Sequence, residues 1–152
     1  MERKLMQILA GLLNEFEEWR RGESDIEPTI IKIHYSIIRS DPNTEQGIIN
    51  LDVIGIAIYS AIEDLNNYND ISRSLAVLTY HLITSHPFVD GNKRTAFVLL
   101  LNILYELFNK EIPQDLEEEL IKTLVEVADN PPEEDEYAIN KIRKIIRKII
   151  ED

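Results

Sequence analysis

The chain has 152 residues, of which 44% are hydrophobic and 29% are charged, and it contains no cysteine. This length and composition predict one soluble globular domain over residues 1–152 and exclude disulfide bonds and thiolate metal sites. The formal net charge of −12 argues against a nucleic-acid partner, because phosphate binding needs a basic surface. No apolar run could span a bilayer and the first residues lack the features of a signal peptide, so we expect a cytoplasmic protein without a membrane partner.

Apolar residues recur at helical spacing along almost the whole chain. The polar loop 66–70 ends in residues that can cap the helix that follows it. No strand of any length and no internal repeat is evident. The pattern predicts an all-α bundle of about six to seven helices. The predicted helices span about 4–20, 28–38, 51–64, 71–85, 95–108, 116–127 and 133–150.

The last predicted helix is acidic at its start and basic at its end. Residues 133–136 are all acidic, and five bases gather at 141–148. A basic cluster of this kind is compatible with a nucleic-acid or membrane-surface patch. Complementing the helix dipole explains the same distribution more simply, so we favour a solvated helix face.

One stretch concentrates polar residues: 86–94, with the sequence His-Pro-Phe-Val-Asp-Gly-Asn-Lys-Arg. It runs into an apolar segment from Phe97 to Phe108, which is broken mainly by Asn102 and Glu106. A helix that is apolar on nearly every side has to be buried. A charged loop therefore opens onto the N-terminus of a buried central helix, where unpaired N–H groups and the helix dipole favour an anion such as phosphate.

Four residues of this stretch suit phosphate binding. Gly91 lets the backbone approach a ligand closely, because no Cβ intervenes. Asn92 can cap the helix or offer its amide to phosphate oxygens. Lys93 supplies a compact positive charge, and Arg94 supplies a planar fork for bidentate phosphate contact.

Two further residues suit the transfer reaction itself. Asp90 alone cannot cage a metal, but one carboxylate together with substrate phosphate oxygens is the usual way Mg²⁺ is held. His86 has an imidazole, the side chain that can accept a hydroxyl proton near neutral pH, as a general base should. Pro87 and Phe88 are assigned to structure, with Phe88 expected in the core. The combination predicts phosphate-transfer chemistry on a hydroxyl with a Mg-nucleotide as donor.

Residues 86–94 resemble the Fic/Doc signature, H-x-F-x-[D/E]-[G/A]-N-[G/K]-R. The form with Lys93 is similar to the Doc ("death on curing") branch, whereas the Fic branch has glycine at that position. Weaker similarity extends from about residue 30 to 130 and includes the glycine-containing segment 47–51. The resemblance implies an all-helical core over about 28–130, with helical extensions in 1–25 and 131–152.

The resemblance also implies roles for the motif residues. In Fic enzymes the motif histidine deprotonates a target hydroxyl that attacks the α-phosphate of ATP. These roles fall here on His86 as the base, Asp90 as the Mg²⁺ ligand, and Asn92 and Arg94 as phosphate contacts. In Doc, the lysine is associated with a reversed nucleotide pose that presents the γ-phosphate, and Doc is a protein kinase toxin acting on translation elongation factor Tu. Lys93 is therefore expected to decide between the two reactions, and His86, Lys93 and Arg94 are expected to be the catalytic residues.

We accordingly expect a Doc-like kinase that transfers the γ-phosphate of Mg-ATP to a Ser or Thr of a protein, such as a translation factor, within a toxin–antitoxin pair. One rival is a Fic-type adenylyltransferase, and another is a non-catalytic scaffold that binds nucleotide or antitoxin. The inhibitory string [S/T]-x-x-x-E-[G/N] is absent, so inhibition would need a separate antitoxin. The terminal helices are expected to extend the core, cover the site or form a homodimer.

The two remaining histidines lie outside the motif. His81 lies five residues before His86, a spacing that does not stack two metal ligands on one helix face. His34 lies on an otherwise apolar stripe. Both are expected to be core or near-site histidines rather than metal ligands.

Overall fold

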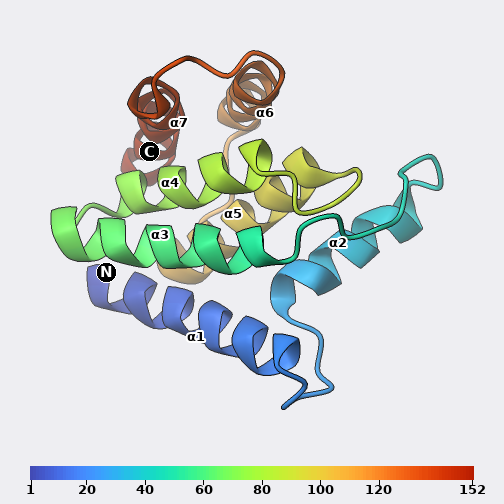
Figure 1. Ribbon diagram of the computed structural model, residues 1–152. Helices are drawn as coiled ribbons and strands as arrows, with labels where there is room; N and C mark the ends of the chain where they lie inside the picture. The colour runs from blue at the N-terminus through green and yellow to red at the C-terminus, as the bar shows by residue number, and fades with distance from the viewer.

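The computed structural model describes residues 1–152 and contains seven helices and no sheet (Figure 1). The all-α bundle predicted from the sequence is confirmed. An isolated β-bridge between Ile48 and Phe88 is the one extended pairing. None of the helices combines the length and the apolar composition needed to cross a membrane. The helices are α1 (Glu2–Arg20), α2 (Thr29–Ser40), α3 (Asp52–Tyr68), α4 (Ile71–Thr84), α5 (Asn92–Phe108), α6 (Gln114–Asp129) and α7 (Asp135–Glu151).

One cluster of 34 buried apolar residues draws members from all seven helices. The most enclosed helix is α4, in which ten of the 14 residues are buried. It packs against α3, α5, α6 and α7. Helix α1 lies on the other side of α3, while α6 and α7 cover the opposite side of α4 (Figure 1). The first and last helices therefore complete the same core that supports the motif loop.

Helix α5 keeps an exposed stripe near its C-terminal end, although its apolar composition predicts burial on nearly every side. Leu99, Leu100 and Ile103 lie in the core, whereas Tyr105 is 55% exposed. The two polar breaks in the apolar run, Asn102 and Glu106, lie on the same exposed stripe. The physical reason is the placement of α6, which packs mainly on α4 and α7 and leaves this face of α5 uncovered.

The junction of α3 and α4 is a tight turn. Helix α3 continues to Tyr68, beyond the predicted end near Asp64, because Leu65 still packs into the core. Asn69 then adopts a left-handed conformation with φ 52°, which ends the helix. Asp70 caps α4 as predicted, since its carboxylate accepts a hydrogen bond from the backbone N–H of Arg73 at 3.2 Å.

A network of ion pairs links α7 to the junction of α3 and α4. The Arg73 side chain, which is 13% exposed, donates to Asp64 at 2.9 Å and to Glu136 of α7 at 2.6 and 3.0 Å. Arg143 of α7 donates to the second oxygen of the capping carboxylate of Asp70. Part of the basic cluster of the last helix is thus paired within the protein.

Candidate functional site

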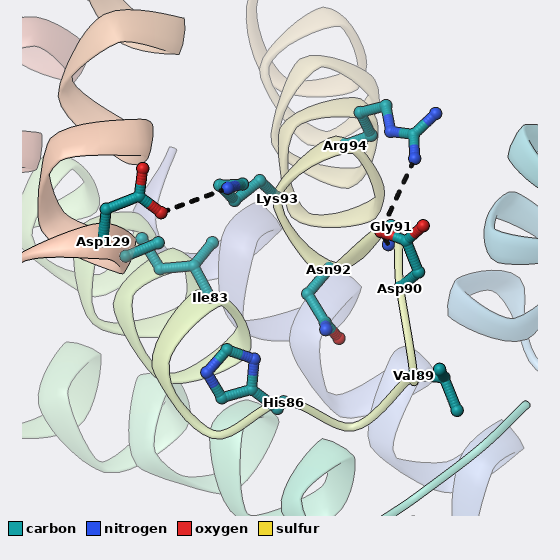
Figure 2. A pocket seen from close by; sticks show the side chains of 10 residues that line it. Ile83, His86, Val89, Asp90, Gly91, Asn92, Lys93, Arg94 and Asp129 are labelled. Atoms are coloured by element: carbon teal, nitrogen blue, oxygen red, sulfur yellow. Dashed lines mark hydrogen bonds and ion pairs between the residues drawn. The ribbon is translucent and has the colours of Figure 1, made fainter. Parts of the chain in front are cut away.

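Residues 86–94 form the end of the connection between α4 and α5 and the first turn of α5, and most of them border a pocket of about 430 Å³ (Figure 2). Ile83 of α4 and the last two residues of α6, Ala128 and Asp129, complete its wall. The structure brings all six predicted site residues to this pocket: His86, Asp90, Gly91, Asn92, Lys93 and Arg94.

His86 lies two residues after the end of α4 and is exposed. Its ring projects into the space between Ile83 and Asn92 (Figure 2). The backbone of His86 is left-handed, with φ 51°, a conformation that histidine tolerates better than most non-glycine residues but that still costs free energy. The chain thus turns sharply after α4, and this turn presents the imidazole to the pocket.

The N-terminus of α5 offers unpaired hydrogen-bond donors to the same pocket. The first intrahelical bond of this end runs from the Thr95 N–H to the Gly91 carbonyl, at 2.9 Å. The backbone N–H groups of Asn92, Lys93 and Arg94 precede it and have no backbone acceptor. Together with the helix dipole, these three donors form a site suited to an anion.

Gly91 forms the turn that exposes the unpaired N–H groups of α5. It is the N-cap of α5 and adopts φ 80°, a left-handed conformation that glycine enters without strain. A Cβ at this position would lie 3.5 Å from carbon atoms of His34 and Thr44, which are therefore close beneath the loop.

His34 is the buried support of the motif loop. Its ring stacks on Phe88, with centroids 3.7 Å apart and planes 5° apart, and Nδ1 lies 3.4 Å from Thr95 Oγ1. Its Nε2 atom is buried and has no hydrogen-bond partner. Burial lowers the pKa of His34, against the opposing effect of the Asp90 charge, so the ring is neutral near pH 7. Phe88 is 1% exposed, which confirms its predicted place in the core.

Both the oxygen and the nitrogen of the Asn92 side-chain amide form hydrogen bonds. Its Oδ1 accepts a hydrogen bond from the Phe88 N–H at 3.0 Å, and its Nδ2 donates to the Phe88 carbonyl at 2.9 Å. The alternative in which Asn92 caps α5 is wrong, because the cap is Gly91 and the Asn92 side chain instead closes the loop. A phosphate contact by this amide stays a prediction.

The two predicted phosphate-binding cations point to opposite ends of the pocket (Figure 2). Arg94 pairs with Asp41 at the end of α2, at 2.9 Å, and lies 3.9 Å from Asp90. Lys93 extends toward α6 and pairs with Asp129 at 3.4 Å. All of these side chains are substantially exposed, so the pairs are weak and a phosphate can replace the carboxylates.

The loop between α2 and α3 lies along the motif. The Gly47 carbonyl accepts a hydrogen bond from the Val89 N–H at 3.0 Å. Gly47 adopts φ 135°, a conformation that other residues rarely enter, and a Cβ there would lie 2.9 Å from Val89 Cγ2, so this position favours glycine. The backbone N–H of Glu45 donates to Asp90 at 3.3 Å. This loop therefore fixes the orientation of the predicted Mg²⁺ ligand.

Sequence reasoning did not identify Asp41, Glu45 and Asp129 as parts of the site. They come from the ends of α2 and α6 and from a loop, far from the motif in the chain. In the sequence, only the segment around Gly47 indicated that this loop contributes to the site, and it did not identify these three carboxylate residues.

Asp90 fits the chemistry of Mg²⁺ binding with a nucleotide. The protein contains no group of three or more His, Asp or Glu side chains that could hold a metal ion without help. Asp90 provides one partly exposed carboxylate beside the donors of α5, and each of its oxygens retains a lone pair beyond the N–H bonds it accepts. Such a site holds Mg²⁺ only when phosphate oxygens supply further ligands.

Residues 29–104, half of the chain, match the family model described as Fic/DOC family. The chain belongs to the Fic/DOC family. Members of this family are typically transferases that act on protein hydroxyls with a nucleotide such as ATP as co-substrate. The matched part of this Fic/DOC protein runs from the start of α2 into α5, so α1, α6 and α7 lie outside it. No curated protein and no solved structure matches the chain.

Proposed function

We propose that this Fic/DOC protein is a Doc-like kinase that transfers the γ-phosphate of Mg-ATP to a Ser or Thr hydroxyl of a protein target. The observation that carries the proposal is the position of Lys93, which stands where the Fic branch has glycine. Its side chain lines the pocket and extends from the start of α5 toward Asp129 of α6, and His86 lines the same pocket. A lysine fills space that would otherwise accept a diphosphate against the backbone and favours a different placement of the phosphates.

In the proposed transfer, one bond to the γ-phosphorus forms and one breaks, and His86 takes up the proton. The target hydroxyl gives its proton to the His86 imidazole, and its oxygen forms a bond to the γ-phosphorus. The bond between that phosphorus and the β,γ-bridging oxygen breaks, and ADP leaves with the electron pair. The exposed position of His86 supports this role, since a protein hydroxyl has to reach it from outside.

Phosphate binding falls to the start of α5. The unpaired N–H groups, Lys93 and Arg94 would hold the phosphates, and Arg94 would exchange its contact with Asp41 for a phosphate oxygen. Asp90 would hold Mg²⁺ together with the phosphates, and the ion would neutralise charge that develops during transfer.

The experiment uses purified protein, Mg²⁺, ATP labelled at the γ-phosphate and a cell lysate as the source of targets. The matched control is His86→Asn, because asparagine tolerates the left-handed backbone at this position but cannot act as the base. Lysate kinases give the same background with both proteins. We expect the wild type alone to give a labelled protein band in addition to this background, whereas equal labelling by the two proteins would contradict the mechanism.

We further propose that the protein is the toxin of a toxin–antitoxin pair with a translation factor as the target. The resemblance to the Doc branch supports this role, as does the absence of the inhibitory string from the chain. Expression of the wild type is expected to arrest growth, and expression of His86→Asn is expected not to. Growth arrest by both proteins would contradict a toxicity that depends on transfer by His86.

A further inference from the structure

The outer face of α7 carries charge of opposite sign at its two ends. The apolar side of the helix packs into the core, and the opposite side faces solvent. The outer face begins at the exposed acids Glu133 and Glu134, just before the first turn of α7. It continues through five exposed residues of the helix: Tyr137, Asn140, Lys144, Arg147 and Lys148. The face is therefore negative at its start and positive toward its end.

The helix dipole explains only part of this distribution. Its effect is confined to the last turn of a helix, and Lys148 is the one base in the last turn of α7. The other bases gather nearer the middle of the helix, around a hollow of about 380 Å³ that no carboxylate lines. The residues that line this hollow are Tyr137, Asn140, Lys141, Arg143, Lys144 and Arg147.

Ion pairs within the protein leave part of the positive charge uncompensated. Arg143 donates to Asp70, which is its fixed partner at the junction of α3 and α4. The Arg147 guanidinium lies 3.6 Å from the same carboxylate, and its side chain is 49% exposed. Lys144 is exposed and takes part in no ion pair. Arg147 and Lys144 are therefore available to an anionic group outside the chain.

The acidic start of the face is likewise uncompensated. Glu136 is paired with Arg73, so it belongs to the junction and not to the outer face. Glu133 and Glu134 are exposed, and neither takes part in an ion pair. The same face thus presents free carboxylates at one end and free cations at the other.

The spacing of these groups makes the face complementary to itself. Glu134 and Arg147 lie equally far along the chain from the midpoint of residues 140–141, and so do Tyr137 and Lys144. Two α7 helices that pack antiparallel about a twofold axis at this midpoint place Glu134 of each copy opposite Arg147 of the other. The Tyr137 ring then lies opposite the aliphatic part of Lys144. A twofold axis repeats every contact, so each of these pairs forms twice.

We propose that α7 forms the interface of a weak, reversible homodimer, in which two copies pack antiparallel along their outer faces. The inference does not depend on the proposed function. The net charge of −12 opposes association at long range, but salt screens exposed charges that are more than about 8 Å apart at physiological ionic strength. The paired groups lie closer than this, so the local complementarity outweighs the overall repulsion.

The test measures association by sedimentation over a range of protein concentrations in about 0.1 M salt, where charges beyond about 10 Å are screened. Glu134→Arg and Arg147→Glu each place like charges opposite one another twice in a homodimer. Each variant alone should associate at least roughly tenfold more weakly than the wild type, because two attractive pairs become repulsive.

An equimolar mixture of the two variants gives the decisive result. In a mixed dimer, the two substituted positions face each other with opposite charges, and the unchanged Glu134 and Arg147 keep their pair. The mixture should therefore associate about as strongly as the wild type. A variant that merely damaged the fold could not be rescued in this way.

The matched control is Glu18→Arg on α1, which makes the same charge change as Glu134→Arg on the other side of the bundle (Figure 1). It should associate as the wild type does. A wild type that stays monomeric, a dimer that neither α7 variant weakens, or a mixture that associates no better than its separate components would overturn the inference. A monomeric wild type that binds a labelled oligonucleotide, with binding lost in Lys144→Glu, would assign the face to nucleic acid and would overturn it as well.

Discussion

Two regions of the molecule are rich in ion pairs, and they differ in burial. At the junction of α3, α4 and α7, Arg73 is 13% exposed, and it bonds to two carboxylates, one of which, Asp64, is nearly buried. In the motif loop, Lys93 and Arg94 are each more than 40% exposed, and each pairs with a carboxylate that water also reaches. In the first region the charged side chains are enclosed and keep their ion-pair partners. In the second region water or a ligand can replace an ion-pair partner.

The difference separates a structural cluster from a candidate active site. An enclosed ion pair is costly to break, because removing one partner leaves the other charge without compensation. An exposed pair contributes little to stability, and a ligand can replace one member. Substitutions at the junction should therefore reduce stability, and substitutions in the motif should reduce activity.

The largest effect is expected for His86→Asn. Loss of the general base should lower the rate of transfer by about 10²- to 10⁴-fold. The free energy of unfolding should stay close to the wild-type value, because the side chain is exposed and asparagine tolerates its backbone conformation. Initial rates and urea unfolding on the same preparation check both statements, and a variant that is as active as the wild type would contradict the assignment.

At the junction, Arg73→Met should lower the free energy of unfolding by roughly 3 kcal/mol, because Asp64 would be left nearly buried without its partner. Burial alone already raises the pKa of Asp64, and Arg73 is the main influence that opposes this rise. Urea unfolding measures the loss. The double variant Arg73→Met with Asp64→Leu should recover part of it, and a single variant as stable as the wild type would remove the distinction between the two regions.

Glycine substitutions test whether the motif depends on backbone conformation. Gly91→Ala should destabilise the protein by roughly 1 kcal/mol, because its φ of 80° is strained for alanine. Gly11→Ala, in the middle of α1 with no atom near the added Cβ, should instead stabilise it by roughly 0.5–1 kcal/mol. Thermal unfolding of the two variants should give shifts of opposite sign; shifts of the same sign would count against the proposed role of Gly91.

The last effect concerns the pH dependence of stability. Burial lowers the pKa of both His34 and His81 from the ordinary value of 6.5. The unfolded chain therefore binds more protons than the folded protein just below pH 6.5. The stability that the neutral rings provide is complete above this pH and is lost as the pH falls, by up to about 1.4 kcal/mol per pH unit for each histidine.

His34→Phe isolates one of these contributions. Phenylalanine can keep the stack on Phe88 but cannot titrate. The loss of stability from about pH 7 to about pH 5, measured by urea unfolding, should be smaller in this variant than in the wild type. The carboxyl groups are the same in both proteins, so the difference reports His34. An equal or steeper loss in the variant would contradict a buried neutral ring.

The helices were predictable because each has its own apolar period. The repeat of Leu5, Leu9 and Phe16 marks the buried side of α1, and the capping role of Asp70 follows from its place before the apolar period of α4. The exposed stripe of α5 was not predictable, because it depends on where α6 packs and not on the composition of α5.

The motif could be located from sequence because its chemistry is contiguous, but its surroundings could not. The sequence allows Asn92 to be a helix cap or a phosphate contact, but it does not show that the amide bonds to the Phe88 backbone, because that contact depends on how the loop folds. Asp41 and Asp129 reach the motif through the packing of α2 and α6, and neither carries a local signal. Tertiary structure therefore supplies the carboxylate partners of the two cations.

The most direct test of the central claim is the position of the transferred label. Wild-type protein, Mg²⁺ and lysate are incubated in parallel with ATP labelled at the α-phosphate or at the γ-phosphate, with His86→Asn as the background. The account predicts His86-dependent labelling of protein from γ-labelled ATP alone. Labelling from α-labelled ATP would show adenylyl transfer and would contradict the role assigned to Lys93. The absence of His86-dependent label from both compounds would contradict catalysis and would favour the non-catalytic scaffold.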